Sequence, residues 1–120
     1  MTNYDWQRMA HDLATEVMGW CFNSSHQIYT DDLGCRKVNK SDWRPYEDLN
    51  QAWMLGQQKG QCLLSFWVNA EHESEAHRCR IHQDEHASEA LHKSPAKAIM
   101  LAVAKAIDLN LSDYEVSDGT

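Results

Sequence analysis

The sequence predicts an α/β/α sandwich of the α+β class, with a mainly antiparallel sheet of about four strands and helices on both of its faces. Three observations lead to this prediction. Apolar residues recur at helical spacing in three segments, which alternate with segments of strand-like pattern. Short polar connections join neighbouring strand-like segments, which favours hairpins and therefore antiparallel pairing. Residues 62–68 are apolar at nearly every position, which indicates a strand covered on both faces.

The predicted order is α-β-β-α-β-β-α, in a single domain over residues 1–111 with an acidic C-terminal tail over residues 112–120. The first helix is expected to be capped by Thr2 or Asn3 and to end at Gly19. One of its faces is apolar at helical spacing, with Trp6, Met9, Ala10, Leu13 and Val17. This face is therefore expected to lie against the core.

The next segments predict a hairpin and a central helix. Residues 27–30 and 35–38 flank an Asp-rich turn that ends in Gly34. Pro45 keeps the residue before it extended, and Asp48 or Glu47 can then cap the central helix. The apolar stripe expected on this helix consists of Leu49, Ala52, Trp53 and Gly56. A glycine inside a helix weakens it, so Gly56 is expected to permit a close packing contact.

The second half predicts another hairpin and a final helix. After a loop at residues 69–74, residues 76–82 alternate, with His77, Cys79 and Ile81 on one face and Arg78, Arg80 and His82 on the other. Residues 84–93 are polar and are expected to form a loop. Ser94 and Pro95 start a helix that is apolar over most of its circumference. Such a helix is either buried on two sides or part of a subunit interface, so a homo-oligomer is expected.

Composition excludes several classes of function. The 120-residue chain has a formal net charge of −7, which argues against non-specific nucleic-acid binding and against binding to an anionic membrane. An acidic surface is compatible with a basic protein partner. No signal peptide and no run of 18 apolar residues is present, so a cytoplasmic, soluble protein is expected. The four cysteines are scattered singly, as is typical of reduced thiols.

The sequence contains no recognisable catalytic constellation, and neither an enzyme nor a cofactor is expected. It has no Gly-rich phosphate loop and no nucleophile with an adjacent base. Histidines do cluster in one stretch, and a metal-dependent enzyme that uses them is the alternative: His72, His77, His82, His86 and His92. Their spacing is irregular for a metal site, so a solvated polar hairpin is favoured and no metal ligand is assigned.

The candidate ligand-binding residues are arginines and aromatic residues. Arg78 and Arg80 share a strand face, and with Arg36, Lys37 and Arg44 they can form a small basic pocket for a phosphate group. Trp43 or Tyr46 can then stack on a base or a ribose. The alternative interpretation is that Arg78 and Arg80 face solvent or pair with the many carboxylates.

Three motifs resemble the phage ABA sandwich family of small phage and prophage proteins. They are the turn Val17-Met18-Gly19-Trp20, the segment from Trp43 and Pro45 through Asp48, Asn50, Ala52 and Trp53, and the helix start Ser94-Pro95 with Ala98 and Ile99. The resemblance extends from about residue 10 to residue 107. It implies an α/β/α sandwich and a phage or prophage origin. It implies no activity, because the function of the family is largely unknown.

Small phage proteins of this size often counter host defences. We therefore expect a non-enzymatic binding protein of the host cytoplasm, which binds a host defence protein or sequesters a small nucleotide signal. A structural or accessory phage protein without a role in defence is the alternative.

Overall fold

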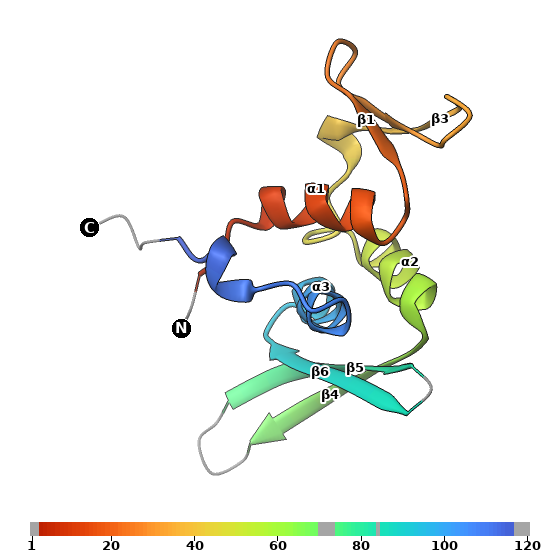
Figure 1. Cartoon of the computed structure of the whole chain (residues 1–120). Helices are drawn as coiled ribbons and strands as arrows, with labels where there is room; N and C mark the ends of the chain where they lie inside the picture. Colours follow the sequence, from red (N-terminus) through yellow and green to blue (C-terminus); the bar gives the residue numbers. More distant parts are fainter. Residues whose placement is uncertain (1–2, 70–73, 84, 117–120) are drawn as a thin grey trace.

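A computed structural model describes residues 3–69, 74–83 and 85–116 of the chain. Elements are labelled in chain order (Figure 1). They are α1 (Trp6–Glu16), β1 (Cys21–Asn23), β2 (Ile28–Thr30), β3 (Arg36–Asn39), the 3-10 helix η1 (Lys40–Asp42), α2 (Leu49–Lys59), β4 (Gln61–Asn69), β5 (Ser74–Gln83), β6 (His86–His92), α3 (Pro95–Ala106) and the 3-10 helix η2 (Leu111–Tyr114).

The strands in the described residues form two antiparallel sheets of three strands each, ordered β1-β2-β3 and β4-β5-β6. In Figure 1, α1, α2 and α3 lie between the small first sheet and the longer second sheet. The predicted class, an antiparallel α+β sandwich, is confirmed. The strand count differs from the single sheet of about four strands that the sequence suggested, because β1 and β6 were not expected.

The β4-β5-β6 sheet is covered by helix on one face. Cys79 and Ile81 are fully buried on the inner face, where α3 packs, whereas Leu63 and Leu91 are 47% and 49% exposed on the outer face. All three helices lie on the inner side of this sheet (Figure 1). The cover on both faces that we expected for residues 62–68 is therefore wrong for residues 62–65, and the burial of residues 66–68 lies outside what the structure describes. A run of apolar residues does not by itself show that both faces of a strand are covered, because apolar side chains are also common on protein surfaces.

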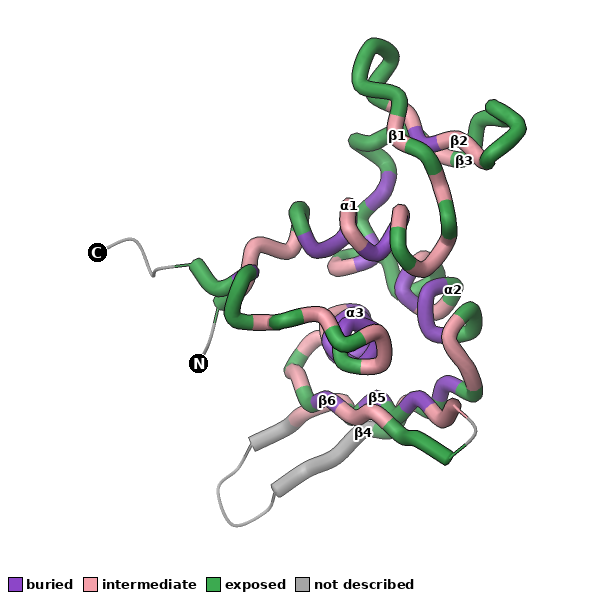
Figure 2. Tube along the Cα trace, in the orientation of Figure 1, coloured by how far each residue is buried: buried purple, intermediate pink, exposed green. Residues whose placement is uncertain are grey.

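α3 is enclosed within the chain. Burial includes residues around its whole circumference (Figure 2): Ala96, Ala98, Ile99, Met100, Leu101, Ala102, Val103 and Ala104. Ser94 caps the helix through a hydrogen bond to the backbone N–H of Lys97. Of the two interpretations of this apolar helix, burial on two sides is the one that the structure shows. Its apolar surface therefore gives no argument for a subunit interface.

The caps of α1 and α2 show how the sequence sets the helix boundaries. Asp5 caps α1 by accepting a hydrogen bond of 3.1 Å from the backbone N–H of Arg8, so the expected cap Asn3 is wrong. The other expected cap, Thr2, lies outside the described residues. Asp48 caps α2 and accepts hydrogen bonds from the backbone N–H groups of Asn50 and Gln51, as expected.

The buried stripe of α2 differs from the expected stripe, in which Trp53 is only partly buried. Leu49 is 43% exposed, and Leu55 is buried together with Ala52 and Gly56. A Cβ atom added at Gly56 would lie 2.6 Å from the Sγ atom of Cys62. Gly56 therefore permits the close approach of α2 to β4 that the sequence predicted.

The segment expected as an acidic tail is attached to the domain up to Val116. Tyr114 is buried, and its hydroxyl donates a short hydrogen bond to a carboxylate oxygen of Asp12. Tyr4 and Glu115 form an isolated antiparallel bridge. Aromatic packing and backbone pairing thus extend the domain beyond the boundary suggested by the run of acidic residues. Residues 117–120 lie outside the described part of the chain.

Candidate functional site

A surface cavity of about 650 Å³ lies where α1, β2, η1 and the entry into α2 meet. We call it the η1–α2 cavity. Its polar walls come from Gln7, Gln27, Lys40, Ser41, Arg44 and Glu47, and its aromatic walls from Tyr29, Trp43 and Tyr46. A shallower hollow adjoins it at Arg44 and Glu47. The size and mixed lining of the cavity are those of a small-molecule site.

Trp43 fixes the inner wall of the cavity. The side chain is only 4% exposed, and its indole N–H donates a hydrogen bond of 2.8 Å to the carbonyl oxygen of Ala10 in α1. Its ring packs edge-on against Trp20, with 4.9 Å between centroids, and near Tyr29. Trp43 therefore joins α1 to the segment before α2, and its ring is largely engaged in the core instead of offering a full stacking face.

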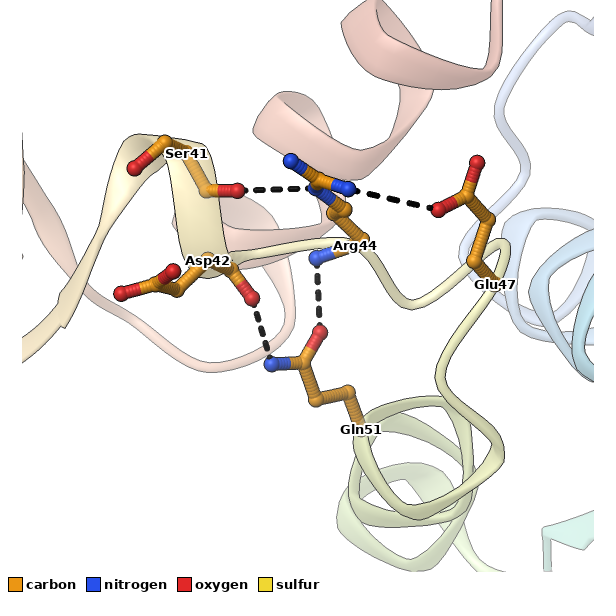
Figure 3. Close-up of polar contacts among 5 residues, drawn as sticks. All are labelled: Ser41, Asp42, Arg44, Glu47 and Gln51. Carbon is orange, nitrogen blue, oxygen red and sulfur yellow. Dashed lines mark hydrogen bonds and ion pairs between the residues drawn. The ribbon is translucent and has the colours of Figure 1, made fainter.

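Arg44 is held at the mouth of the cavity by its neighbours (Figure 3). Its Nε donates a hydrogen bond of 2.8 Å to the carbonyl oxygen of Ser41, and Nη1 lies 3.6 Å from a carboxylate oxygen of Glu47. Gln51 supports this turn by accepting a hydrogen bond from the backbone N–H of Arg44 and donating one to the carbonyl oxygen of Asp42. The ion pair with Glu47 is solvent-exposed and therefore weak, so an anionic ligand can compete for the guanidinium.

Tyr29 forms the floor of the cavity and is neutral at physiological pH. Its hydroxyl lies 2.9 Å from Nδ1 of His11, and the side chain is fully buried. Burial, with a smaller effect of the nearby Asp12 carboxylate, raises the pKa of Tyr29 to about 12. Tyr29 is thus an uncharged, almost completely buried ring beneath the cavity that Lys40 and Arg44 also line.

The predicted ligand-binding residues fall into two separate places. Trp43, Arg44 and Tyr46 all line the η1–α2 cavity. Arg78 and Arg80 instead lie on the outer face of the β4-β5-β6 sheet, on the other side of the helical layer (Figure 1). There, Glu89 pairs with both of them, at 3.0 Å from Arg78 and 3.8 Å from Arg80. The pairing of these arginines with a carboxylate was the alternative interpretation from the sequence.

The sequence analysis missed the contributions of Lys40 and Gln7 to the cavity. Lys40 belongs to a short polar connection, and its backbone N–H donates to the carbonyl oxygen of Gln27 as η1 begins. Gln7 lies on the exposed side of α1, next to the apolar stripe. Lys40 could have been identified by its proximity to Trp43 in the sequence. Gln7 had no such signal, because it joins the site through tertiary packing alone.

The described histidines do not form a metal site. His77 and His92 are cross-strand neighbours on β5 and β6, whereas His82 lies on the outer face of β5. His92 accepts a hydrogen bond from the backbone N–H of Ser94, and burial and the neighbouring Lys97 lower its pKa. Within residues 3–69, 74–83 and 85–116, no group of three or more potential ligands is close enough to hold a metal ion. His72 lies outside the described residues.

The four cysteines are free thiols. Cys21 and Cys35 are exposed, and Cys62 and Cys79 are buried side by side with 3.6 Å between their sulfur atoms. The hydrogen bond with Cys62, together with burial, raises the pKa of the Cys79 thiol. A protonated, buried thiol is a poor nucleophile, so Cys79 acts as packing in the core.

These observations define a small antiparallel α+β domain with one helical layer and a cavity beside η1. The sequence model of the phage ABA sandwich domain family matches residues 11–103. The chain therefore belongs to the phage ABA sandwich domain family, a family of unknown function.

Comparison with solved structures supports the fold. The chain is similar to a phage protein from Bacillus cereus ATCC 14579 in a crystal structure, with a TM-score of 0.64 and 9% sequence identity. The similarity covers 92% of this chain and 94% of that chain. No curated protein matches the chain. No helix in the described residues is long and apolar enough to cross a membrane.

Proposed function

We propose that this chain is a non-enzymatic phage binding protein that holds a small anionic ligand with an aromatic ring, such as a nucleotide, in the η1–α2 cavity. The observation that carries the proposal is the presence of Lys40, Arg44 and Tyr46 in the lining of one cavity of about 650 Å³. Guanidinium and ammonium groups bind phosphate oxygens, and an aromatic side chain contacts a base or a ribose. Both elements of nucleotide recognition are therefore present in one place.

The composition of the cavity supports binding rather than catalysis. Glu47 is the one carboxylate among the described lining residues, and its oxygen is paired with Arg44. A nucleophile next to a base and an orienting third group is the usual arrangement for acyl or phosphoryl transfer. The described lining contains no such set. The proposal is therefore sequestration of an intact ligand.

Sequestration of a nucleotide signal is a way to interfere with a host defence system. Membership of a phage family supports this role, because a phage gains from removing a signal that the infected cell produces. The proposal keeps Trp43, Arg44 and Tyr46 from the residues identified in the sequence. It assigns no ligand contact to Arg78 and Arg80, since both lie on the other side of the helical layer and pair with Glu89.

A host defence protein as partner is the second candidate. The specific observation is the tip of the β2–β3 hairpin, where Leu33 is 85% exposed next to Asp31 and Asp32. Hydrogen bonds from the backbone N–H groups of Cys35 and Leu33 hold Asp31 in place and lower its pKa. Oδ2 of Asp31 also lies 3.7 Å from Nζ of Lys37, and Asp32 adds a second carboxylate next to Leu33. An apolar tip preceded by two carboxylates is complementary to an apolar pocket with a basic rim.

A thermal-shift screen against linear and cyclic nucleotides tests the first candidate. A ligand at a hundred times its Kd stabilises the native state by about 2.7 kcal/mol. We expect one nucleotide to raise the Tm of the wild type, and Arg44→Ala to remove most of that shift. Arg80→Ala is the matched control and should retain it, because Arg80 is an exposed arginine far from the cavity.

Two results would count against this assignment. A shift that Arg80→Ala abolishes and Arg44→Ala preserves would move the site to the outer face of the sheet. A screen without any shift would favour the protein partner. In that case, a pull-down from host lysate with wild type and Leu33→Asp would test the hairpin tip.

A further inference from the structure

The edge of β4 is the feature that the cavity leaves unexplained. Within the described residues, β4 is an outer strand of its sheet and pairs with β5 alone. The backbone hydrogen bonds outside helices and strands include none from residues 61–69 in that part of the chain. Within the part of the chain that the structure describes, one side of this nine-residue strand therefore has N–H and C=O groups without a neighbouring strand.

The chemistry of β4 is that of an unprotected edge. Its sequence, Q-C-L-L-S-F-W-V-N, contains no charged residue and no proline. Soluble proteins usually protect a long edge strand with charges, prolines or bulges, because an open edge pairs with another chain. The opposite edge, β6, is shorter and carries Glu89 between two terminal histidines. Of the two edges of this sheet, β4 is therefore the one suited to pairing.

The outer face next to this edge is compatible with a second copy of the chain. Leu63 is exposed on this face. The neighbouring strand β5 carries Arg78 and Arg80, and β6 carries one carboxylate, Glu89. Among the described residues that face outward next to positions 63 and 65 of β4, Glu89 is thus the one carboxylate, and it is paired with both arginines. Two such edges can approach without direct repulsion between carboxylates.

We propose that two copies of this chain pair through β4, antiparallel about a two-fold axis at Ser65, to form a continuous six-stranded sheet. The order of residue types in the sequence of β4 is symmetric about Ser65, so in such a pair polar positions meet polar positions and apolar positions meet apolar positions, which makes the edge self-complementary. Gln61 opposes Asn69 of the second copy, and the apolar residues 62–64 oppose the apolar residues 66–68. The pairing also supplies partners for the open backbone groups.

The occupant is a second copy because this symmetry is a property of β4 itself. Pairing with an unrelated strand would not depend on whether the two halves of β4 match each other. The sequence suggested self-association through the helix at residues 95–106, but α3 is enclosed within the chain. The β4 edge gives a separate basis for self-association, and it does not depend on the ligand in the η1–α2 cavity.

Opposite charges at Ser65 test the proposed axis. In a two-fold pair, position 65 of one copy lies directly opposite position 65 of the other, with Cβ atoms about 4.5–5.5 Å apart. Ser65→Glu and Ser65→Lys should each weaken the homodimer at least about tenfold, because like charges then face each other. An equimolar mixture of the two variants should restore dimers. Ser65 is exposed in the single chain and lies opposite Arg78 on β5, so thermal denaturation of both variants is measured alongside to confirm that each remains folded.

Matched controls come from the other edge of the same sheet. Ala87 is exposed on β6, so Ala87→Glu and Ala87→Lys introduce the same charges away from β4. Sedimentation equilibrium should give twice 13.8 kDa for the wild type and for both controls. A monomeric wild type at all concentrations would overturn the proposal. So would a dimer that both Ser65 variants preserve, or a mixture that fails to restore dimers.

Hydrogen exchange on the unmodified chain gives an independent readout. Amide protection in residues 61–69 should rise with protein concentration, whereas protection in residues 86–92 should not change. Protection that rises in β6 and not in β4 would place the interface at the wrong edge and contradict the proposal.

Discussion

Gly56 lies where α2 packs against β4, and the Gly56→Ala substitution tests this packing. In an unobstructed helix, replacing glycine with alanine stabilises the fold by about 1 kcal/mol. At Gly56, however, the new Cβ would lie 2.6 Å from Sγ of Cys62, 3.1 Å from its Cβ and 3.3 Å from Cγ2 of Ile99. Overpacking of a close-packed core costs about 1–3 kcal/mol. We therefore expect Gly56→Ala to lower the free energy of unfolding by about 1 kcal/mol.

A double-mutant cycle with Cys62→Ala isolates the cause. The second substitution removes Sγ and leaves the two contacts above 3 Å, which small shifts can relieve. Gly56→Ala should then be less harmful in the Cys62→Ala background by about 1 kcal/mol. Urea denaturation measures all four free energies, with Gln58→Ala as an exposed control on the same helix. A Gly56→Ala variant more stable than the wild type, or equal effects in both backgrounds, would refute the reasoning.

Three further substitutions follow from the caps, the buried indole and the buried phenol. Asp48→Ala should lose about 1 kcal/mol in urea denaturation because it removes the cap of α2, and an unchanged midpoint would contradict this role. Trp43→Phe should lose about 1–3 kcal/mol, since the carbonyl of Ala10 loses its buried donor; a smaller loss than for an exposed control would argue against the contact. For Tyr29, the raised pKa predicts stability that is complete below pH 10 and is lost as the pH rises toward 12. Tyr29→Phe should flatten this decline, and a parallel pH profile would contradict the assignment.

Local patterns predicted most of the helices and the hairpin partners correctly. The Asp48 cap, the glycine at position 56 and the alternation along residues 76–82 each depend on neighbours in sequence, so they could be recognised without the fold. β6 could not be recognised in this way. Its residues, H-A-S-E-A-L-H, have little strand propensity, and the strand is stabilised by pairing with β5 and by packing against α3.

The candidate site was predicted in part, for a related reason. Trp43, Arg44 and Tyr46 are close in sequence, and the structure places all three around one cavity. Strand alternation placed Arg78 and Arg80 on one face correctly. It contains no information about which strand pairs next to them or which elements lie near that face. Only the fold shows that Glu89 on β6 is their neighbour and that the cavity lies beyond the helices.

Retention of an unmodified nucleotide is the measurement that tests the proposed function most directly. The protein is mixed with the nucleotide selected by the thermal-shift screen, passed through a desalting column and then denatured to release what it holds. Our account predicts about one intact nucleotide for each η1–α2 cavity, and a large reduction in Arg44→Ala but not in Arg80→Ala. A converted nucleotide, or no retained nucleotide at a concentration that saturates the thermal shift, would contradict binding without turnover in this cavity.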